Sequence, residues 1–253
     1  MKIAGQTACI CPLFSSTEQY FRAYLTADRP DFSVTVTQEN LDLEQAWLDE
    51  EADSEGLRRR QFTGPFLERA AIQRAFAEHL LLHDTVMLHG STVAVDGRAY
   101  LFTARCGTGK STHTRLWREV FGSRAVMIND DKPFLRIKDG VVTAFGAPWS
   151  GKHGLDSNIN APLQGICILD RGADNRILPI SAGEALQLLL HQSYQPFANA
   201  SRVRNDALVI RVAETVPLWR MTCNRLPQAA QIAYDAMSSA RTKMPPSAAD
   251  RNA

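Results

Sequence analysis

The chain has 253 residues, of which 45% are hydrophobic and 22% are charged. This length and composition predict one large domain, or a core with a small appended lobe, and exclude wholesale disorder. Lys and Arg number 28 against 27 Asp and Glu, so the formal net charge is +1. A whole-chain electrostatic attraction to nucleic acid or to an anionic membrane is therefore not expected.

The sequence shows neither a membrane-spanning segment nor a secretory signal. No apolar run approaches the roughly 20 residues that cross a bilayer, and Met1 to Leu13 contains no long apolar stretch of the secretory type. We therefore predict a cytoplasmic protein. The five cysteines are scattered and odd in number, as is typical of reduced thiols. Cys9 and Cys11 are predicted to lie on a buried strand, since no second Cys/His pair accompanies them.

The first 83 residues are predicted to form a small α/β region whose last helix packs on the core. A strand from Lys2 ends in a turn at Pro12, residues 16–25 form a short helix, and residues 32–37 alternate as a half-buried strand. The charged segment 40–60 is predicted to be a partly exposed helix and loop. Residues 65–83 carry apolar side chains at helical spacing.

Residues 84–240 are predicted to form the core. Segments 86–95 and 98–103 are predicted strands joined by a hairpin at Asp96-Gly97, and residues 134–145 form a second hairpin about Asp139-Gly140. Between them, residues 125–131 make a buried strand that ends in acidic residues.

Shorter elements follow towards the carboxyl end. Strands are predicted at 166–169, 176–180 and 216–223, and a closing helix at 227–239. Ser181 and Glu184 have the spacing of a capping box that opens a helix to about His191. The segment after Arg241, rich in Pro, Ser, Ala and Asp, is predicted to be a mobile tail.

The chain is organised around Phe102-Thr-Ala-Arg-Cys-Gly-Thr-Gly-Lys-Ser-Thr112. A predicted strand precedes this segment and a predicted helix follows it, which is the sequence form of a phosphate-binding loop. Glycines let several backbone N–H groups converge on one anion, and the helix N-terminus adds partial positive charge. The predicted nucleotide-binding residues are Gly107, Thr108, Gly109, Lys110, Ser111 and Thr112. Lys110 would contact the outer phosphates, and the Ser111 hydroxyl would bind Mg²⁺.

One position departs from the motif. The pattern G-x-x-x-x-G-K-[ST] has Gly where this chain has Ala104. Alanine adopts a positive φ only at a cost, so the start of the loop is predicted to be shifted or slightly strained. The alternative is a surface turn that happens to contain this run of residues.

Asn129-Asp130-Asp131 stands about twenty residues beyond Lys110, at the end of an apolar strand. Phosphoryl transfer needs charge neutralisation by Mg²⁺ and an acceptor for the proton of the nucleophile. One carboxylate could hold the metal and the other could take the proton. A turn with two solvated acids is the alternative interpretation. His89, just before the hairpin, could contact a phosphate or orient an acid, although a lone histidine is more often structural.

His89-Gly90, then a hairpin, then the loop ending Gly109-Lys110-Ser111, then a strand ending Asp130-Asp131 resembles the HPr kinase/phosphorylase family. That family shares a P-loop lineage with the phosphoenolpyruvate carboxykinases, and the resemblance covers about residues 85–135. It implies an α/β fold with a P-loop core and a hairpin-rich mixed sheet, together with the small N-terminal α/β region.

The resemblance also implies an enzyme. The reaction would be Mg²⁺-dependent transfer of a phosphoryl group from ATP or GTP to a hydroxyl, usually a serine of a peptide or small protein. Lys110 and Ser111 would hold phosphates and metal, Asp130 would be the metal-side acid, Asp131 the base, and His89 would lie near the transferred group. The resemblance also allows a homo-oligomer.

Residues outside the shared motif differ from the family. A Glu-x-Arg-Gly segment is absent after the Asp pair, and Gly146-Ala-Pro-Trp-Ser-Gly-Lys-His153 stands in roughly that place. This difference points away from phosphorylase activity and towards kinases similar to lasso-peptide tailoring enzymes. We hypothesise that Lys152 meets the transferred phosphate or an acidic group of the substrate, and that Trp149 lines the acceptor site. The alternative is an ordinary hairpin exit with a packed Trp.

Other basic residues are interpreted as surface groups. His113 and Arg115 are expected on the exposed face of the helix after the loop, and Arg202, Arg204 and Arg211 form a solvated cluster, although one of them could act as a charge clamp. Two other functions stay open: a carboxykinase-like reaction on a small carboxylic acid, and a regulatory nucleotide-binding module without turnover.

Overall fold

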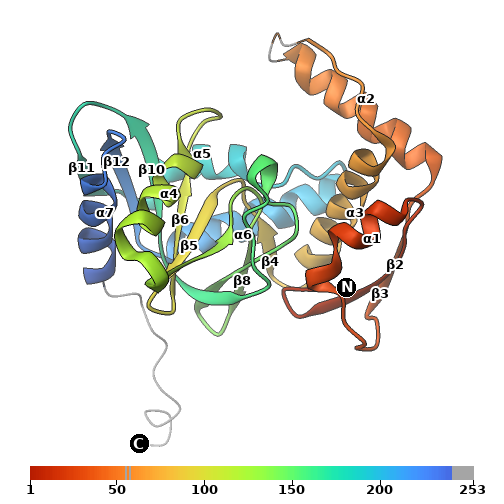
Figure 1. Cartoon of the computed structure of the whole chain (residues 1–253), viewed down its shortest axis with the longest axis horizontal. Helices are drawn as coiled ribbons and strands as arrows, with labels where there is room; N and C mark the ends of the chain where they lie inside the picture. The colour runs from red at the N-terminus through yellow and green to blue at the C-terminus, as the bar shows by residue number, and fades with distance from the viewer. Residues whose placement is uncertain (55, 57, 241–253) are drawn as a thin grey trace, which may run out of the picture. The chain divides into compact units, whose positions relative to one another are not determined.

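The computed structural model describes residues 1–54, 56 and 58–240, and Figure 1 shows the whole chain. The predicted mobile tail at 241–253 lies outside the described residues. The chain divides into two compact units, Met1–His79 and Leu80–Ala253, where the sequence pattern placed a boundary after residue 83. Both units mix helices with strands. None of the described helices combines the length and apolarity that a membrane span requires.

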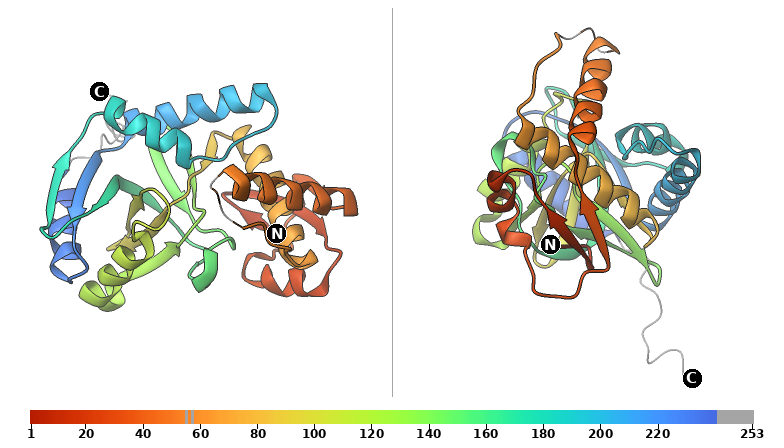
Figure 2. Two further views of the ribbon diagram at one scale, coloured as in Figure 1. Left: turned by 90° about the horizontal axis from the view of Figure 1, so that it is seen from above. Right: turned by 90° about the vertical axis from the view of Figure 1, so that its right-hand side faces the viewer.

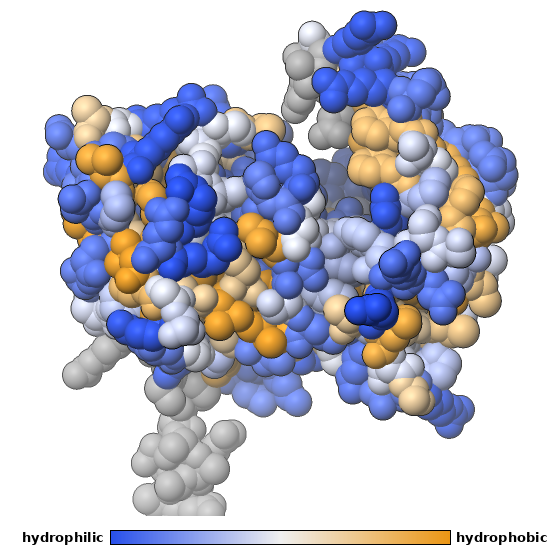
Figure 3. Space-filling view, in the orientation of Figure 1, coloured by the Kyte–Doolittle hydropathy of each residue, from blue (hydrophilic) through white to orange (hydrophobic). Residues whose placement is uncertain are grey.

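The N-terminal unit has a three-stranded sheet in the order β1-β2-β3, made of β1 (Lys2–Ile3), β2 (Gln6–Cys11) and β3 (Phe32–Thr35). Strands β1 and β2 are antiparallel, while β2 and β3 are parallel. The helices are α1 (Ser15–Tyr20), the 3₁₀ turn η1 (Arg22–Tyr24), α2 (Gln38–Ser54) and α3 (Gly64–Leu81). On the face drawn in Figure 3, the far end of α2 is mostly hydrophilic, which agrees with its acidic sequence.

Two predictions for this unit were wrong. The single strand predicted from Lys2 is a hairpin, because Ala4 and Gly5 both adopt positive φ (46° and 76°) and reverse the chain. Cys9 and Cys11 do lie on a strand, but both are exposed, because β2 is buried only at Thr7 and Ala8.

The C-terminal unit holds a nine-stranded mixed sheet with the path β4-β8-β9-β10-β6-β5-β7. Off this path, β12 pairs with β10, and β11 pairs with β12. The strands are β4 (Thr85–Met87), β5 (Ser91–Val95), β6 (Arg98–Thr103), β7 (Ala125–Asn129), β8 (Phe134–Lys138), β9 (Val141–Phe145), β10 (Asn160–Arg171), β11 (Arg176–Pro179) and β12 (Leu218–Cys223). Strand β10 is long enough to pair with β9 through its first residues and with β6 and β12 through the rest.

Helices cover both faces of this sheet (Figure 2). Helices α4 (Lys110–Phe121) and α7 (Gln228–Ser239) pack on one face, while α5 (Ala182–Gln192) and α6 (Asn199–Thr215) pack together on the other. Trp117, Phe102 and Met237 are all fully buried in the core between β6, α4 and α7. Short 3₁₀ turns η2 (Gly122–Arg124) and η3 (Gly151–His153) complete the unit.

Several local predictions are confirmed. Both Asp-Gly pairs turn antiparallel hairpins, with φ of 51° and 76° at Asp96-Gly97 and of 51° and 75° at Asp139-Gly140. Ser181 and Glu184 form the reciprocal capping box of α5.

The single strand predicted at 86–95 was wrong, because residues 88–90 separate β4 from β5 and the two strands pair with different neighbours. Helix α6 received no prediction. The available signal was the buried set Leu208, Val209, Val212 and Ala213, whose spacing is helical.

Gly146, at the end of β9, provides a stability test. A Cβ built on it would lie 1.9 Å from the Ser157 carbonyl oxygen and 2.8 Å from that of Ile128, so Gly146→Ala forces backbone apart. We expect this variant to lose about 1–3 kcal/mol of unfolding free energy in a denaturant titration, as in overpacked cores. Gly183→Ala, at an exposed helical position with open space, is the matched control. It should leave stability unchanged or raise it by about 0.4–1 kcal/mol. Equal stability of the two variants would contradict this close packing.

Candidate active site

The candidate site lies at one edge of the C-terminal sheet. Strands β6, β10 and β12 are parallel, and β7 runs in the same direction because it and β6 are both antiparallel to β5. Their carboxyl ends therefore share one edge, which is where open α/β sheets bind ligands. Thr103, Asn129, Arg171 and Cys223 end these four strands. The segment His89-Gly90 enters β5 at the same edge.

The loop between β6 and α4 has the backbone of an anion site. Gly107 and Gly109 adopt positive φ (74° and 122°), which other residues rarely do. Gly109 is the N-cap of α4 and supplies no side-chain cap, so the first N–H groups of this helix are left for a ligand. The predicted strand, loop and helix are all present.

Ala104 does not strain the loop, contrary to the prediction. It is not among the non-glycine residues with positive φ, so its methyl group costs nothing there. The side chain is 1% exposed and belongs to the core that includes Phe102 and Trp117. Glycine is therefore not required at this position.

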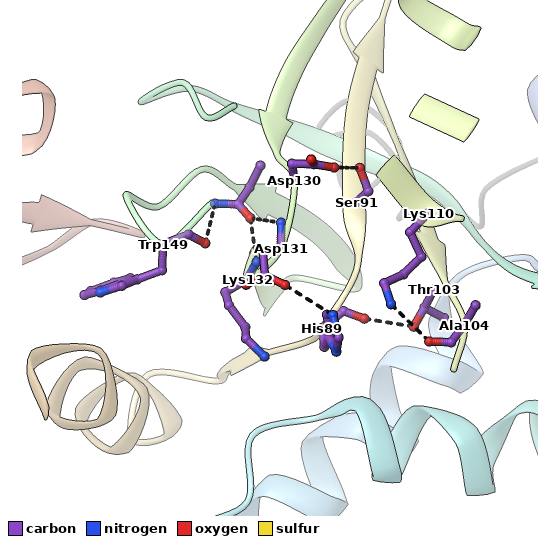
Figure 4. A network of polar contacts seen from close by, with 10 residues as sticks. His89, Ser91, Thr103, Ala104, Lys110, Asp130, Asp131, Lys132 and Trp149 are labelled. Atoms are coloured by element: carbon purple, nitrogen blue, oxygen red, sulfur yellow. Dashed lines mark hydrogen bonds and ion pairs between the residues drawn. The ribbon is translucent and has the colours of Figure 1, made fainter. Parts of the chain in front are cut away.

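Lys110 folds back over the loop in Figure 4, and its Nζ donates to the Ala104 carbonyl at 3.2 Å. The residue is 9% exposed. Burial lowers the pKa of Lys110, while the nearby Cys106, Asp131 and Asp130 act in the opposite direction. A buried ammonium group with a single carbonyl partner gains from a phosphate that approaches it.

Asp130 is tied to helix α4 through a buried hydroxyl chain. Ser91 Oγ donates to Asp130 Oδ1 at 2.6 Å and lies 2.7 Å from Thr114 Oγ1. Because the Ser91 proton goes to the carboxylate, Thr114 donates to Ser91 in this chain. All three residues are at most 6% exposed. The network links the carboxylate to Thr114 of α4, which lies one turn after Ser111 and Lys110.

Asp131 points in the other direction and pairs with His89 (Figure 4). The distance from His89 Nε2 to Asp131 Oδ1 is 3.2 Å, and both side chains are about one-third exposed or less. Burial lowers the pKa of His89, although the bond to Asp131 opposes this effect. Burial alone would raise the pKa of Asp131, but His89, Lys132 and Lys110 lower it overall. Near neutral pH the pair is therefore a carboxylate that accepts from a neutral imidazole.

Three backbone-linked contacts position His89. The backbone N–H of His89 donates to the Gln192 carbonyl at 2.7 Å, and the His89 carbonyl accepts from Thr103 Oγ1 at 2.9 Å. The next N–H, of Gly90, donates to the Asp131 carbonyl at 3.0 Å. A Cβ on Gly90 would lie 3.0 Å from the Phe102 carbonyl oxygen, so the close approach to β6 favours glycine. The break between β4 and β5 thus brings His89 to the site.

Asn129 organises the turn that carries both acids. Its Oδ1 accepts from the N–H groups of Asp131 (2.8 Å) and Lys132 (2.6 Å), and its Nδ2 donates to the carbonyls of Ala147 (2.6 Å) and Trp149 (3.3 Å). The Trp149 ring packs edge-on to Phe134 and the residue is 6% exposed. Trp149 therefore has a packing role rather than an open surface for an acceptor.

Gly151 brings the following loop against Asp131. Its φ is 68°, and a Cβ there would lie 3.3 Å from the Asp131 Cβ. The next residue, Lys152, is exposed on η3. The predicted site residues Lys110, Asp130, Asp131 and His89 are thus brought together, and Lys152 follows a glycine at which a side chain would meet Asp131.

Sequence reasoning missed two residues at this edge, Arg171 and Lys132. Arg171 Nε donates to the Thr108 carbonyl at 3.2 Å and its Nη2 donates to the Gly107 carbonyl. Lys132 influences the pKa of both His89 and Asp131. A cation next to the acid pair was the signal for Lys132, but nothing local links Arg171 to the loop.

The structure differs from the sequence interpretation at His113 and agrees with it at Arg115. His113 is buried rather than on the helix surface; its Nε2 accepts from Trp117 Nε1 at 3.1 Å. Arg115 is exposed and pairs with Glu119, as expected of a surface residue. Arg211 pairs with Asp84, and Arg202 donates to the Pro196 carbonyl at 3.2 Å.

The donor set at the edge suits magnesium rather than a closed metal cage. Among the described residues, no group of three or more His, Cys, Asp or Glu could hold a metal ion. The hydroxyl of Ser111 and the carboxylate of Asp130 are oxygen donors, and Mg²⁺ usually binds one or two such groups together with phosphates. The residues present fit that ion.

No family model and no curated protein matches the chain. Among solved structures, the HPr(Ser) kinase/phosphatase of Coxiella burnetii is similar to 60% of this chain and 99% of its own chain, with 10% identity and a TM-score of 0.36.

The His89–Asp131 pair can be tested by NMR titration. We expect the pKa of His89 to lie below its ordinary 6.5, and to fall further in Asp131→Asn, because the carboxylate is what raises it. His113 is buried and bonded to Trp117 in the core, so it serves as the control, with its pKa unchanged. A His89 pKa that rises in Asp131→Asn would contradict this pairing.

His113 makes stability depend on pH. Burial lowers the pKa of His113 to about 4, so only the unfolded chain binds this proton between about pH 6.5 and 4. Unfolding free energy should be fully retained above pH 6.5 and fall by about 3 kcal/mol towards pH 4 through this group alone. His113→Gln should show a flatter slope over that window, whatever its stability at neutral pH. If denaturant titrations gave His113→Gln the same pH dependence of unfolding free energy as the wild type, His113 would not be its source.

Proposed function

We propose that the protein is a Mg²⁺-dependent kinase that transfers the terminal phosphoryl group of ATP or GTP to a hydroxyl, most often a serine, of a peptide or small protein. The observation that carries this proposal is the Asp131–His89 pair, 3.2 Å apart, at the same sheet edge as Asp130 and the glycine-rich loop with Lys110. A cytoplasmic location and assembly into a homo-oligomer belong to the same proposal.

The loop and α4 would bind the phosphates. The uncapped first turn of α4 directs N–H groups and partial positive charge at an anion. Lys110 would exchange its bond with the Ala104 carbonyl for a phosphate oxygen. Thr108 and Thr112 flank this turn and would add hydroxyl groups. Ser111 and Asp130 would hold Mg²⁺, which when bound neutralises charge on the phosphate oxygens.

Asp131 is the residue placed to take the proton of the acceptor hydroxyl. It is ionised at neutral pH, since His89, Lys132 and Lys110 lower its pKa despite burial. Neutral His89 donates to one carboxylate oxygen and so orients the other for the acceptor. Asp130 cannot share this role easily, because the buried Ser91 hydroxyl holds it towards α4.

Cations surround the position where charge would develop. Lys110 and Lys132 both act electrostatically on Asp131 and His89. Lys152 follows Gly151, at which a side chain would meet Asp131, and its exposure leaves it accessible to an incoming substrate. Positive groups around a transferring phosphoryl group stabilise the transition state.

Asp131→Asn tests the base. We expect turnover to fall by about 10²–10⁴-fold, the usual worth of general base catalysis, while nucleotide affinity is retained. Asp139→Asn is the matched control, since Asp139 lies on an exposed hairpin turn where asparagine also tolerates the positive φ. Turnover is measured with ATP, Mg²⁺ and a pool of serine-containing peptides, as a mass gain of one phosphate group. A pool in which every serine is alanine shows whether serine is the acceptor.

Two results would contradict the proposal. Tight ATP binding with no phosphorylated product from any acceptor would favour a regulatory module. Nucleotide consumption that depends on oxaloacetate would favour a carboxykinase-like reaction.

Lys152→Ala tests the second cation. We expect turnover to fall by about tenfold or more, because a charge that stabilises the transition state is removed, with little change in ATP affinity. Lys138→Ala removes an exposed lysine from β8 and is the control for net charge. Wild-type turnover in Lys152→Ala would remove Lys152 from the site.

A further inference from the structure

A cavity of about 350 Å³ opens beside the loop, at the ends of β10 and β12. Its walls include Thr108, Thr112, His113, Leu116, Leu169 and Cys223. This volume lies within the range of small-molecule sites.

The cavity is continuous with the proposed phosphate site. Thr108, Gly109 and Thr112 line the cavity and also belong to the loop and first turn that would bind phosphates. Arg171 stands at the same place and holds the carbonyls of Gly107 and Thr108. These bonds turn two carbonyl oxygens towards the guanidinium group, which keeps them away from a bound anion.

One part of the cavity suits a flat, uncharged ring. The His113 side chain is buried, and its ring lies tilted against that of Phe102. Its Nε2 accepts from Trp117, so its Nδ1 carries the proton and faces Cys223 Sγ at 4.0 Å. Leu116 and Leu169 are apolar residues of the same wall and are almost wholly buried, at 2% and 3% exposure.

The rim of the cavity is polar. Asp170, Asn224 and Arg225 stand there with Arg171. Asn224 is held rigidly, because its side chain donates to the Ala173 carbonyl at 2.9 Å and contacts Asn175 at 3.2 Å. Such a site has an apolar interior with a few placed polar groups, as small-molecule sites commonly do.

We propose that this cavity binds the nucleoside part of the nucleotide, with the base against His113, Leu116 and Leu169 and the ribose towards the polar rim at Asp170 and Asn224. This assignment rests on the proposed function, since it requires that the loop bind the phosphates. It makes Arg171 a positioning residue of the loop.

The chain carries its own reporters for a test. Cys106 lies in the loop, Cys223 lines the cavity, and Cys9 and Cys11 are exposed in the N-terminal unit. Burial raises the pKa of the Cys223 thiol, so alkylation with a small neutral reagent is run at alkaline pH. The rate at each cysteine is followed by peptide mass spectrometry on the full-length wild-type protein, with MgATP, with Mg²⁺ and tripolyphosphate, or with neither.

We expect MgATP to slow alkylation of both Cys106 and Cys223 by about tenfold near saturation, and tripolyphosphate to protect Cys106 alone. Cys9 and Cys11 should react equally in all three conditions. Protection of Cys106 without Cys223 in MgATP would overturn the nucleoside site and leave the phosphate site standing. Protection of neither would overturn both. Equal protection of Cys223 by tripolyphosphate would also overturn the assignment, since the cavity would then respond to phosphates.

A pocket-filling variant provides a second measurement. Cys223→Phe places a ring in the cavity and should weaken ATP binding by about tenfold or more, the scale of discrimination in apolar pockets. Tripolyphosphate affinity of the same variant should match the wild type, which shows that the loop is intact. Equal loss of both affinities would contradict a separate nucleoside site.

Discussion

The direction of four strands is the constraint on which the site depends. Strand β5 lies between β6 and β7 and is antiparallel to both, so β6 and β7 end at the same edge as β10 and β12. The loop after β6, the two acids after β7, Arg171 after β10 and Cys223 after β12 are separated widely in sequence but converge there. Reversing any one strand would carry its terminal residues to the opposite edge of the sheet, about one strand length away.

Buried polar bonds then give each acid a different surrounding. Asn129 holds the turn through both of its side-chain atoms, and Ser91 holds Asp130 at 2.6 Å. Asp131 turns to His89, where two lysines influence it. Adjacent residues of one sequence motif therefore differ in partners and exposure, which supports separate roles for them in metal binding and proton transfer. A buried polar group that loses its hydrogen bond costs free energy. Each bond of this network therefore also keeps the geometry of the site rigid.

The arrangement separates three tasks along the sheet edge. Proton transfer would take place at Asp131 after β7, phosphate binding at the loop after β6, and nucleoside binding in the cavity between the ends of β10 and β12. These positions follow the order of the strands in the sheet, β12-β10-β6-β5-β7. A nucleotide placed along this edge would present its terminal phosphate towards Asp131 and the exposed Lys152.

The sequence by itself determined the parts that depend on a few neighbouring residues. Both Asp-Gly hairpins, the capping box of α5, the strand-loop-helix around Gly107 and Gly109, and the acids after β7 all follow from local φ values and short-range bonds. Only the tertiary structure decided which distant groups meet. Strand pairing and packing bring distant segments together at four places. These are the Ser91 bond to Asp130, the Arg171 bonds to the loop, the burial of His113 and the cavity beside it. Local spacing carries no record of such pairing, because it depends on which strands of the whole unit lie side by side.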